Sequence, residues 1–274
     1  MIHLTINLEQ ENPALLNKKE EERGTLFSIK GTEILLDLFK KHNIKTTIFV
    51  SGFFAENFSD IVKRIVREGH EVGCHGYRHF YEEMDKRTLQ EDIMKAREIL
   101  ERIFDLKILG FRAPQMMYVP DVVEAVHQLG FSYDSSLYSA WMPFKFNHKL
   151  SPLKPFHPLR SGPFMEIPIS GSPRMRLPLN SHMIRKYGSW WAICSCKKLK
   201  KNNINPVLSI HSWDLFPTNG EGLPSRYLRN TGMKFFLVLE KIIRAFPAQE
   251  FTPLKTELRD QPNELLKIIT KKFI

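Results

Sequence analysis

The chain has 274 residues, of which 42% are hydrophobic, and it carries a formal net charge of +10. This length suits one α/β barrel or two small domains, and the hydrophobic content excludes a disordered chain. The excess of Lys and Arg favours an anionic partner. No helix-turn-helix, zinc-finger or RNA-binding pattern accompanies it, so we expect no nucleic-acid partner.

The sequence contains no run of 18 apolar residues, and its first residues lack a signal-peptide pattern. We therefore expect a cytoplasmic protein, and a peripheral position at the inner face of a membrane stays open. The basic amphipathic stretch 265–274 either packs as a solvated helix or touches a membrane surface. Three cysteines without framework spacing are expected to be idle thiols: Cys74, Cys194 and Cys196.

Short apolar runs alternate with helical periodicity along the chain, which is typical of repeated βα units. The predicted strands span residues 3–8, 46–50, 71–75, 108–112, 133–137, 165–169, 207–213 and 251–254. The predicted helices span residues 31–42, 59–68, 89–104, 122–129, 181–201 and 227–245. Prolines interrupt the pattern between about 141 and 180. We predict one barrel-like domain, residues 1–274, with a Pro-rich insertion at about 141–180.

Two histidines, His75 and His79, follow the third predicted strand four positions apart. If residues 75–79 form a helical turn, both side chains lie on one face and converge. Neutral imidazole suits zinc and its first-row neighbours. The alternative is a pair of unrelated surface histidines.

Polar residues also end or follow the other predicted strands. Because the C-terminal strand ends of a barrel open at one mouth, we expect these side chains to meet there: Asn7, Glu9, His75, Arg112, Asp134 and His211. Residues 7 and 9 of a strand point to the same side. Two histidines and one carboxylate, with further positions open, suit a catalytic metal, and Glu9 is the carboxylate we choose.

Five short segments of the sequence resemble the motifs of a known protein family. They are Thr5-Ile-Asn-Leu-Glu9, His75-Gly-Tyr-Arg-His79, Phe111-Arg-Ala-Pro114, Tyr133-Asp-Ser-Ser136 and Leu208-Ser-Ile-His-Ser-Trp213. Together and in this order they resemble the motifs of the polysaccharide deacetylase family (NodB homology, carbohydrate esterase family 4). The resemblance implies an α/β fold, a distorted (β/α) barrel of about seven strands, and metal-dependent removal of N-acetyl groups from an amino-sugar glycan.

The resemblance also implies a metal site. Glu9, His75 and His79 would hold one divalent ion, with zinc preferred and cobalt, nickel or manganese as alternatives. Such an ion polarises an amide carbonyl. The implied partner is an N-acetylated oligosaccharide or polysaccharide, or a lipid-linked glycan, and the oligomeric state is left open.

The remaining roles are implied in the same way. Arg112 would steady the group at the base position, residue 7. His211 would protonate the leaving amine as the general acid, and Asp134 would orient it. Three further residues are expected to contact substrate: Tyr77, Pro114 and Trp213.

Asn7 departs from the family pattern, which has an aspartate as the base at this position. An amide does not accept a proton from water at neutral pH. Three hypotheses follow: the chain is a catalytically silent glycan-binding or assembly protein, another group such as Glu11 takes the proton, or Asn7 stabilises the oxyanion in a modified mechanism. A deformylase of a lipid-linked amino sugar is a further alternative on the same fold.

The pair Trp190-Trp191, outside these motifs, could either pack in the core or stack on a sugar ring. Trp190-Trp191 lies within a predicted helix, where core packing is favoured over stacking on a sugar.

Overall fold

The computed structural model describes residues 1–9, 18–77, 81, 84–143, 146–159, 162–216 and 229–260. Its main feature is a seven-stranded sheet in the order β11-β1-β2-β3-β4-β5-β9. Every neighbouring pair in it is parallel. The strands are β1 (His3–Leu8), β2 (Thr47–Val50), β3 (Glu71–Cys74), β4 (Gly110–Phe111), β5 (Tyr133–Asp134), β9 (Met165–Glu166) and β11 (Val207–His211). The predicted distorted (β/α) barrel of about seven strands is confirmed.

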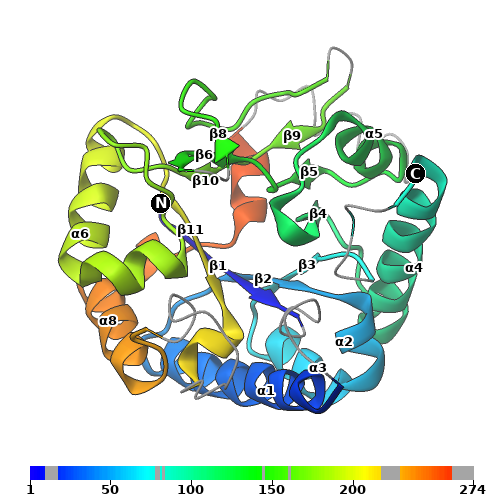
Figure 1. The fold of residues 1–274 in the computed structure, drawn as a ribbon, viewed down its shortest axis with the longest axis horizontal. Coiled ribbons are helices and arrows are strands. Elements are labelled where there is room, and N and C mark those ends of the chain that lie inside the picture. The colour runs from blue at the N-terminus through cyan, green and yellow to red at the C-terminus, as the bar shows by residue number, and fades with distance from the viewer. Residues whose placement is uncertain are drawn as a thin grey trace.

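The helices surround this sheet, with the strands in the middle of the molecule (Figure 1). The α-helices are α1 (Lys18–Lys41), α2 (Gly52–Asn57), α3 (Ser59–Arg67), α4 (Lys86–Phe104), α5 (Pro120–Gln128), α6 (Ser181–Lys201) and α8 (Met233–Arg244). Short 3-10 helices are η2 (Pro114–Met116), η3 (Ser212–Leu215), η4 (Ala248–Glu250) and η5 (Leu254–Asp260). No helix in the described part of the chain is long and apolar enough to cross a bilayer.

Apolar and polar side chains alternate along β1, so the two faces of the sheet differ in polarity. Ile2, Leu4 and Ile6 belong to the core cluster that the strands share with the surrounding helices. The intervening residues of β1 are polar, yet the whole strand is buried. A parallel sheet covered on both faces requires such burial, so the polar positions lie inside the barrel and need partners there.

The Pro-rich insertion contributes strands of its own. These are β6 (Tyr138–Ser139), β7 (Trp141–Met142), β8 (Phe146–Asn147) and β10 (Ile169–Ser170). β6 pairs in parallel with β10, and β7 pairs antiparallel with β8. The single strand predicted at 165–169 is two strands, β9 and β10, separated at Ile167–Pro168. Because β9 pairs with β5, the insertion forms part of the barrel.

Several predicted boundaries are wrong. The strand predicted at 207–213 ends at His211, where η3 begins. In the segment 251–254, Phe251 makes one isolated bridge to Ile2 and η5 follows. The helix predicted from residue 227 begins at Met233, after a turn with Gly232 at φ 65°. The helix predicted at 31–42 begins at Lys18. The single-domain organisation of residues 1–274 stays a prediction.

Candidate active site

Polar side chains lie along the inner face of β1 and extend to the C-terminal edge of the sheet. Thr5, Asn7 and Glu9 occupy alternate positions, so they share one face. The strand register places Asn7 beside His211 of β11. Asn7 and Glu9 are both buried. These residues therefore meet at one edge of the barrel.

Glu9 and His75 form the closest charged contact at this edge. Glu9 Oε2 lies 2.7 Å from His75 Nε2. On the other side of the ring, His75 Nδ1 lies 2.7 Å from the carbonyl oxygen of Arg112. A carbonyl oxygen only accepts hydrogen bonds, so Nδ1 carries the ring proton and donates it to Arg112.

The tautomer of His75 shows whether the side chains of Glu9 and His75 are suited to bind a metal ion. With the proton on Nδ1, the lone pair of His75 Nε2 faces a carboxylate oxygen, and two acceptors at this distance need a positive charge between them. Either a second proton or a metal cation supplies that charge, and imidazole and carboxylate are both zinc ligands. The donor chemistry of Glu9 and His75 therefore fits a divalent cation.

The third predicted ligand, His79, and the alternative base, Glu11, lie outside the described residues. Among the residues that are described, no three His, Cys, Asp or Glu side chains are grouped to hold a metal. The complete ligand set therefore stays a prediction.

Arg112 is the only guanidinium that the described residues place in the barrel interior beside β1. Its Nη1 lies 2.8 Å from Thr5 Oγ1, 3.0 Å from Asn7 Oδ1 and 3.3 Å from Ser209 Oγ. Its Nε donates to the carbonyl oxygen of Ser135 at 2.9 Å. Burial lowers the pKa of Arg112 to about 10, so it stays protonated at neutral pH. A buried cation thus faces a neutral amide at position 7.

His211 stands on the opposite side of the same carboxylate. Its Nε2 lies 3.5 Å from Glu9 Oε1. Its Nδ1 faces Asp214 Oδ2 at 3.6 Å and Ser181 Oγ at 3.4 Å. The ring stacks on Trp213, with centroids 4.9 Å apart. The imidazole is about a quarter exposed, so it reaches both the carboxylate and the mouth.

Asp214 is the carboxylate that accompanies His211. Its Oδ2 accepts a hydrogen bond from the backbone N–H of His211 at 3.1 Å, and its Oδ1 lies 3.2 Å from Arg185 Nε. Burial opposes its ionisation, but the hydrogen bond with His211 and the charge of Arg185 hold the pKa of Asp214 below its usual value. Asp214 stands three residues after His211, a spacing visible in the sequence. Nothing in the sequence pattern pointed to Arg185.

The predicted contact between Asp134 and His211 is not formed among the described residues. Asp134 Oδ1 accepts hydrogen bonds from the backbone N–H of Ser135 and the hydroxyl of Ser136. The register pairs Asp134 with Glu166 of β9, and both are fully buried. The reason is topological: β9 lies next to β5, so Asp134 meets a residue of the Pro-rich insertion.

The ionisation of these two carboxyl groups is linked, because each is fully buried beside the other. Burial raises the pKa of Asp134 to about 6 and raises the pKa of Glu166 well above its usual value. Within the pair, burial and the charge of Asp134 favour the protonated form of the Glu166 carboxyl. This pair was missed because Glu166 lies in a segment without clear periodicity.

The three predicted substrate contacts occupy different places. Trp213 stacks on His211 at the mouth. Pro114 is buried at the start of η2. Tyr77 packs towards the helix layer, because its hydroxyl donates to Glu56 of α2 at 2.9 Å and its ring contacts Lys95 of α4.

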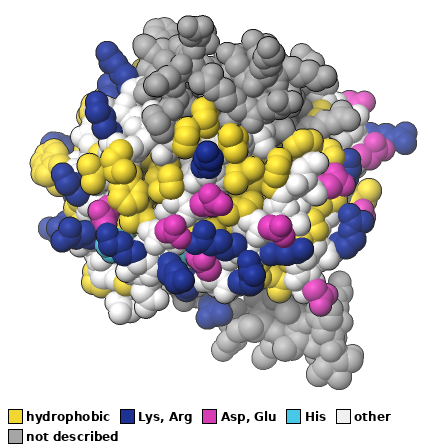
Figure 2. Space-filling model, turned by 90° about the horizontal axis from the view of Figure 1, so that it is seen from below, with side chains coloured by type: hydrophobic (Ala, Val, Ile, Leu, Met, Phe, Trp, Pro, Cys, Tyr) yellow, Lys and Arg dark blue, Asp and Glu magenta, His cyan; other side chains and the backbone are white. Residues whose placement is uncertain are grey.

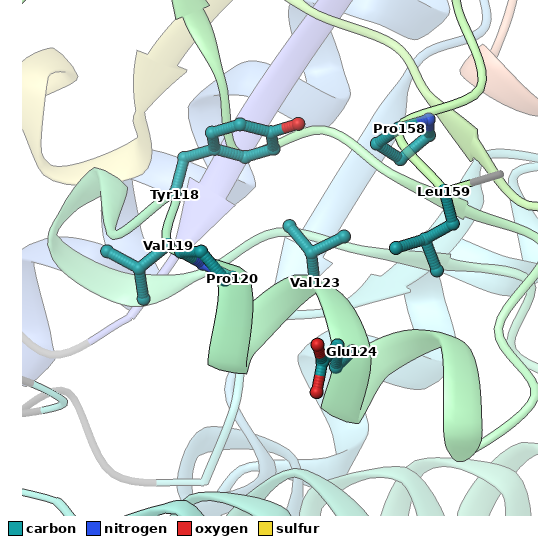
Figure 3. A pocket seen from close by; sticks show the side chains of 7 residues that line it. All are labelled: Tyr118, Val119, Pro120, Val123, Glu124, Pro158 and Leu159. Carbon is teal, nitrogen blue, oxygen red and sulfur yellow. The ribbon is translucent and has the colours of Figure 1, made fainter.

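A separate hollow of about 190 Å³ opens at the start of α5. Figure 3 shows Tyr118 on one side of it, with Pro158 and Leu159 of the Pro-rich insertion on the other. Burial and the nearby charges of Glu166 and Asp134 raise the pKa of the Tyr118 hydroxyl. The residues that line the hollow are mostly apolar.

Comparison with known proteins shows which family the chain resembles. Residues 28–133 match the family model described as polysaccharide deacetylase. The resemblance to the polysaccharide deacetylases is confirmed. A peptidoglycan deacetylase of Helicobacter pylori is 35% identical over 116 residues, which cover 42% of this chain and 40% of that relative. The matched part of this chain thus spans less than half of that deacetylase. The family match includes His75 and Arg112, and it excludes Asn7, Glu9 and His211.

Solved structures support the same fold. A probable polysaccharide deacetylase from Pseudomonas aeruginosa PAO1 superimposes with a TM-score of 0.68 at 20% identity, covering 94% of this chain and 89% of that chain. A pseudoenzyme of carbohydrate esterase family 4 from Bacillus anthracis gives a TM-score of 0.55 at 13% identity, covering 94% and 65%. At these identities the likeness concerns the fold alone.

Proposed function

We propose that this chain hydrolyses N-acetyl groups on an amino-sugar glycan in a metal-dependent reaction, and that Asn7 limits its rate. The family match and the grouping of Glu9, His75, Arg112 and His211 at one strand edge support this proposal. The substrate class follows from relatives such as the peptidoglycan deacetylase of Helicobacter pylori.

Glu9 and His75 would hold the metal, together with His79. When bound there, a divalent cation supplies Lewis acidity that draws electron density from an amide carbonyl. His75 keeps its ligand nitrogen turned to this place because Nδ1 is tied to the carbonyl oxygen of Arg112. Such a hydrogen bond fixes the ring orientation and the tautomer of a ligating histidine.

His211 would protonate the departing nitrogen. A protonated imidazole can give its proton to a departing nitrogen, and the partly exposed ring of His211 faces the mouth beside Glu9. We assign the orienting role to Asp214 in place of Asp134, because its carboxylate faces Nδ1 and is itself held by Arg185. Stacking on Trp213 restricts the ring further.

The contact between Arg112 and Asn7 is the observation that supports a rate of deacetylation limited by the residue at position 7. Arg112 donates to Asn7 Oδ1 at 3.0 Å, in a place where a carboxylate would form a buried, charge-assisted bond. Asn7 satisfies the hydrogen bond, but its amide does not accept the proton that an attacking water must lose. Loss of a general base costs about 10²–10⁴-fold in rate.

The test is Asn7→Asp, an almost isosteric change. We expect acetate release from N-acetylglucosamine oligomers to rise by about 10²–10⁴-fold, and to fall again when a chelator removes the metal. The matched control is Asn7→Leu, which has similar volume and no base, and it should not gain activity. If Asn7→Asp releases acetate no faster than the parent chain, the missing base does not limit the rate.

Asn7 also favours a second function, a catalytically silent glycan-binding protein. The pseudoenzyme from Bacillus anthracis has the same fold, and a mutant of it is described as having restored enzymatic activity. Calorimetric binding of the oligomers by the parent chain, without acetate release, would support this function. Release of formate from an N-formylated amino sugar would instead support the deformylase alternative.

A further inference from the structure

The outer surfaces of α6 and α8 form one continuous face. At their N-terminal ends, Arg185 Nη1 donates to the carbonyl oxygen of Arg229 and Asn230 Nδ2 donates to that of Arg185, both at 2.9 Å. Near their C-terminal ends, Lys200 pairs with Glu250 and lies over the ring of Phe246. α6 bends at Gly188, where the backbone is not helical (φ 80°, ψ 178°), and it contacts the α8 region on both sides of this bend.

This face exposes large apolar side chains. Trp190 and Tyr187 of α6 are 76% and 42% exposed, and Met233 and Leu237 of α8 are 69% and 49% exposed. The prediction that Trp190 packs in the core is wrong. The opposite sides of both helices are buried, so these four side chains point outward. We call them, with the cations around them, the α6–α8 face.

The charge on this face has one sign. α6 contains no Asp or Glu, and the single acid of α8, Glu240, pairs with Lys41 and His42. The exposed cations are Lys186, Lys197, Lys198, Lys201, Lys234, Lys241 and Arg244. On the left of Figure 2, the side where Figure 1 places α6 and α8, hydrophobic side chains lie among Lys and Arg.

Residue spacing aligns the two kinds of side chain. Trp190 lies seven and eleven positions before Lys197 and Lys201, which puts the three on one side of α6. Leu237 lies four positions before Lys241 on α8. Apolar tips are thus bordered by lysines along both helices.

We propose that the α6–α8 face binds the surface of an anionic phospholipid bilayer. Trp and Tyr rings are favoured at the membrane–water interface, and apolar side chains with Lys on the flanks suit the boundary between head groups and acyl chains. A nucleic acid would satisfy the lysines, but it would not bury Trp190, Met233 and Leu237.

The position of this face relates it to the candidate active site. Ser181, the first residue of α6, contacts His211. Gly232, which precedes α8, donates its backbone N–H to the carbonyl oxygen of Asp214 at 2.9 Å. Membrane binding through this face therefore holds the mouth of the barrel close to the lipid head groups. The binding itself does not depend on the proposed deacetylation.

The test is co-sedimentation of the full chain with vesicles. We expect binding to equimolar phosphatidylglycerol and phosphatidylcholine, and much weaker binding to phosphatidylcholine alone. Each lysine at an anionic surface contributes about fivefold, so the double variant Lys186→Gln/Lys234→Gln should bind roughly 25-fold more weakly. The double variant Trp190→Ser/Leu237→Ser should also lose binding.

Matched controls use exposed residues away from this face. Lys63→Gln/Lys95→Gln removes the same charge from α3 and α4, and Leu150→Ser removes an apolar side chain that is 99% exposed. Both should bind nearly as the parent chain does.

Three outcomes would overturn the proposal. If the α6–α8 variants bind as tightly as the parent chain, the membrane contact belongs to another part of the chain. If Trp190→Ser/Leu237→Ser changes the sedimentation coefficient of the free protein but leaves its vesicle binding unchanged, the α6–α8 face is an interface between two copies of this chain. If a single-stranded polynucleotide is retained and the anionic vesicles are not, the partner is nucleic acid.

Discussion

Two sets of buried ionisable residues lie inside the barrel close to the candidate site. Arg112 lies among neutral partners that include Asn7 and Thr5, whereas Asp134 and Glu166 lie against each other. Coulombic attraction to that acidic pair opposes the lowering of the Arg112 pKa by burial. The charge of Arg112 therefore favours ionisation of the carboxyl pair, and the pair favours the protonated guanidinium.

The carboxyl pair predicts a pH dependence of stability. The pKa of Asp134 is raised to about 6 in the folded protein, so the folded state binds more protons than the unfolded state between about pH 4 and 6. The free energy of unfolding therefore falls as the pH rises through this window. Urea unfolding at a series of pH values measures it.

Glu166→Gln isolates this effect. Burial and the neighbouring charge of Asp134 raise the pKa of Glu166, so folding costs free energy at pH 7, where the unfolded chain releases this proton. The amide removes that cost, and we expect Glu166→Gln to be at least as stable as the parent chain at pH 7. A donor that cannot ionise also lowers the pKa of Asp134, so the slope between pH 4 and 6 should shrink. An unchanged slope together with a large loss at pH 7 would mean that Glu166 is ionised.

At the scale of elements, the approach of α1 to η3 positions the candidate acid. Gly31 of α1 lies so close to η3 that a Cβ atom there would stand 1.9 Å from the carbonyl oxygen of Ser212. Ser212 follows His211 directly, and Asp214 belongs to the same 3-10 helix. A side chain at position 31 would therefore displace the segment that carries the proposed acid and its carboxylate.

Gly31→Ala tests this packing. Ala in a helix interior is favoured over Gly by about 1 kcal/mol, but overpacking costs about 1–3 kcal/mol, and the backbone oxygen cannot rotate away. We expect net destabilisation in urea unfolding. Glu33→Ala, at an exposed position of the same helix, is the control and should change stability by less than about 0.5 kcal/mol. Stabilisation by Gly31→Ala would show that η3 moves without cost.

The accuracy with which the sequence predicts the bounds of an element differs between elements. The alternation in β1 and the helical spacing of α4 follow from local periodicity, so both elements were predicted near their observed bounds. The end of β11 was placed too late because Trp213 adds a large apolar residue just after His211, whereas η3 turns there to pack against Gly31. Close packing of distant segments leaves no periodic signal.

The candidate site shows the same limit. The position of His75 and Arg112 at strand ends predicts that they meet, because parallel strands share an edge. Which carboxylate reaches His211 depends on the strand order and on the turn after β11. Asp134 was assigned from motif order alone, and its neighbour Glu166 is set by the pairing of β5 with β9.

At the scale of the whole molecule, β1 is joined to the last described segment. His3 Nε2 lies 2.6 Å from Glu257 Oε1, across a sequence separation of 254 residues. The same carboxylate oxygen accepts a hydrogen bond from Asn205 Nδ2 at 2.7 Å. One side chain of η5 thus connects β1 with the segment that leads into β11.

Glu257→Ala should destabilise the protein by about 1–3 kcal/mol, because it leaves the fully buried His3 without this partner. Chemical unfolding followed by far-UV circular dichroism measures the loss. Lys255→Ala, which alters an exposed side chain of the same 3-10 helix, is the control. Equal stability of the two variants would show that water replaces the carboxylate at His3.

The place of β1 in the sheet also constrains the order of events during synthesis. β1 lies between β2 and β11, so one edge of the first strand stays unpaired until residues 207–211 leave the ribosome. Exposed strand edges invite pairing with other chains, and distant pairings form slowly. The nascent chain therefore exposes this strand edge until β11 has been made, and incompletely paired intermediates of this kind are prone to aggregation.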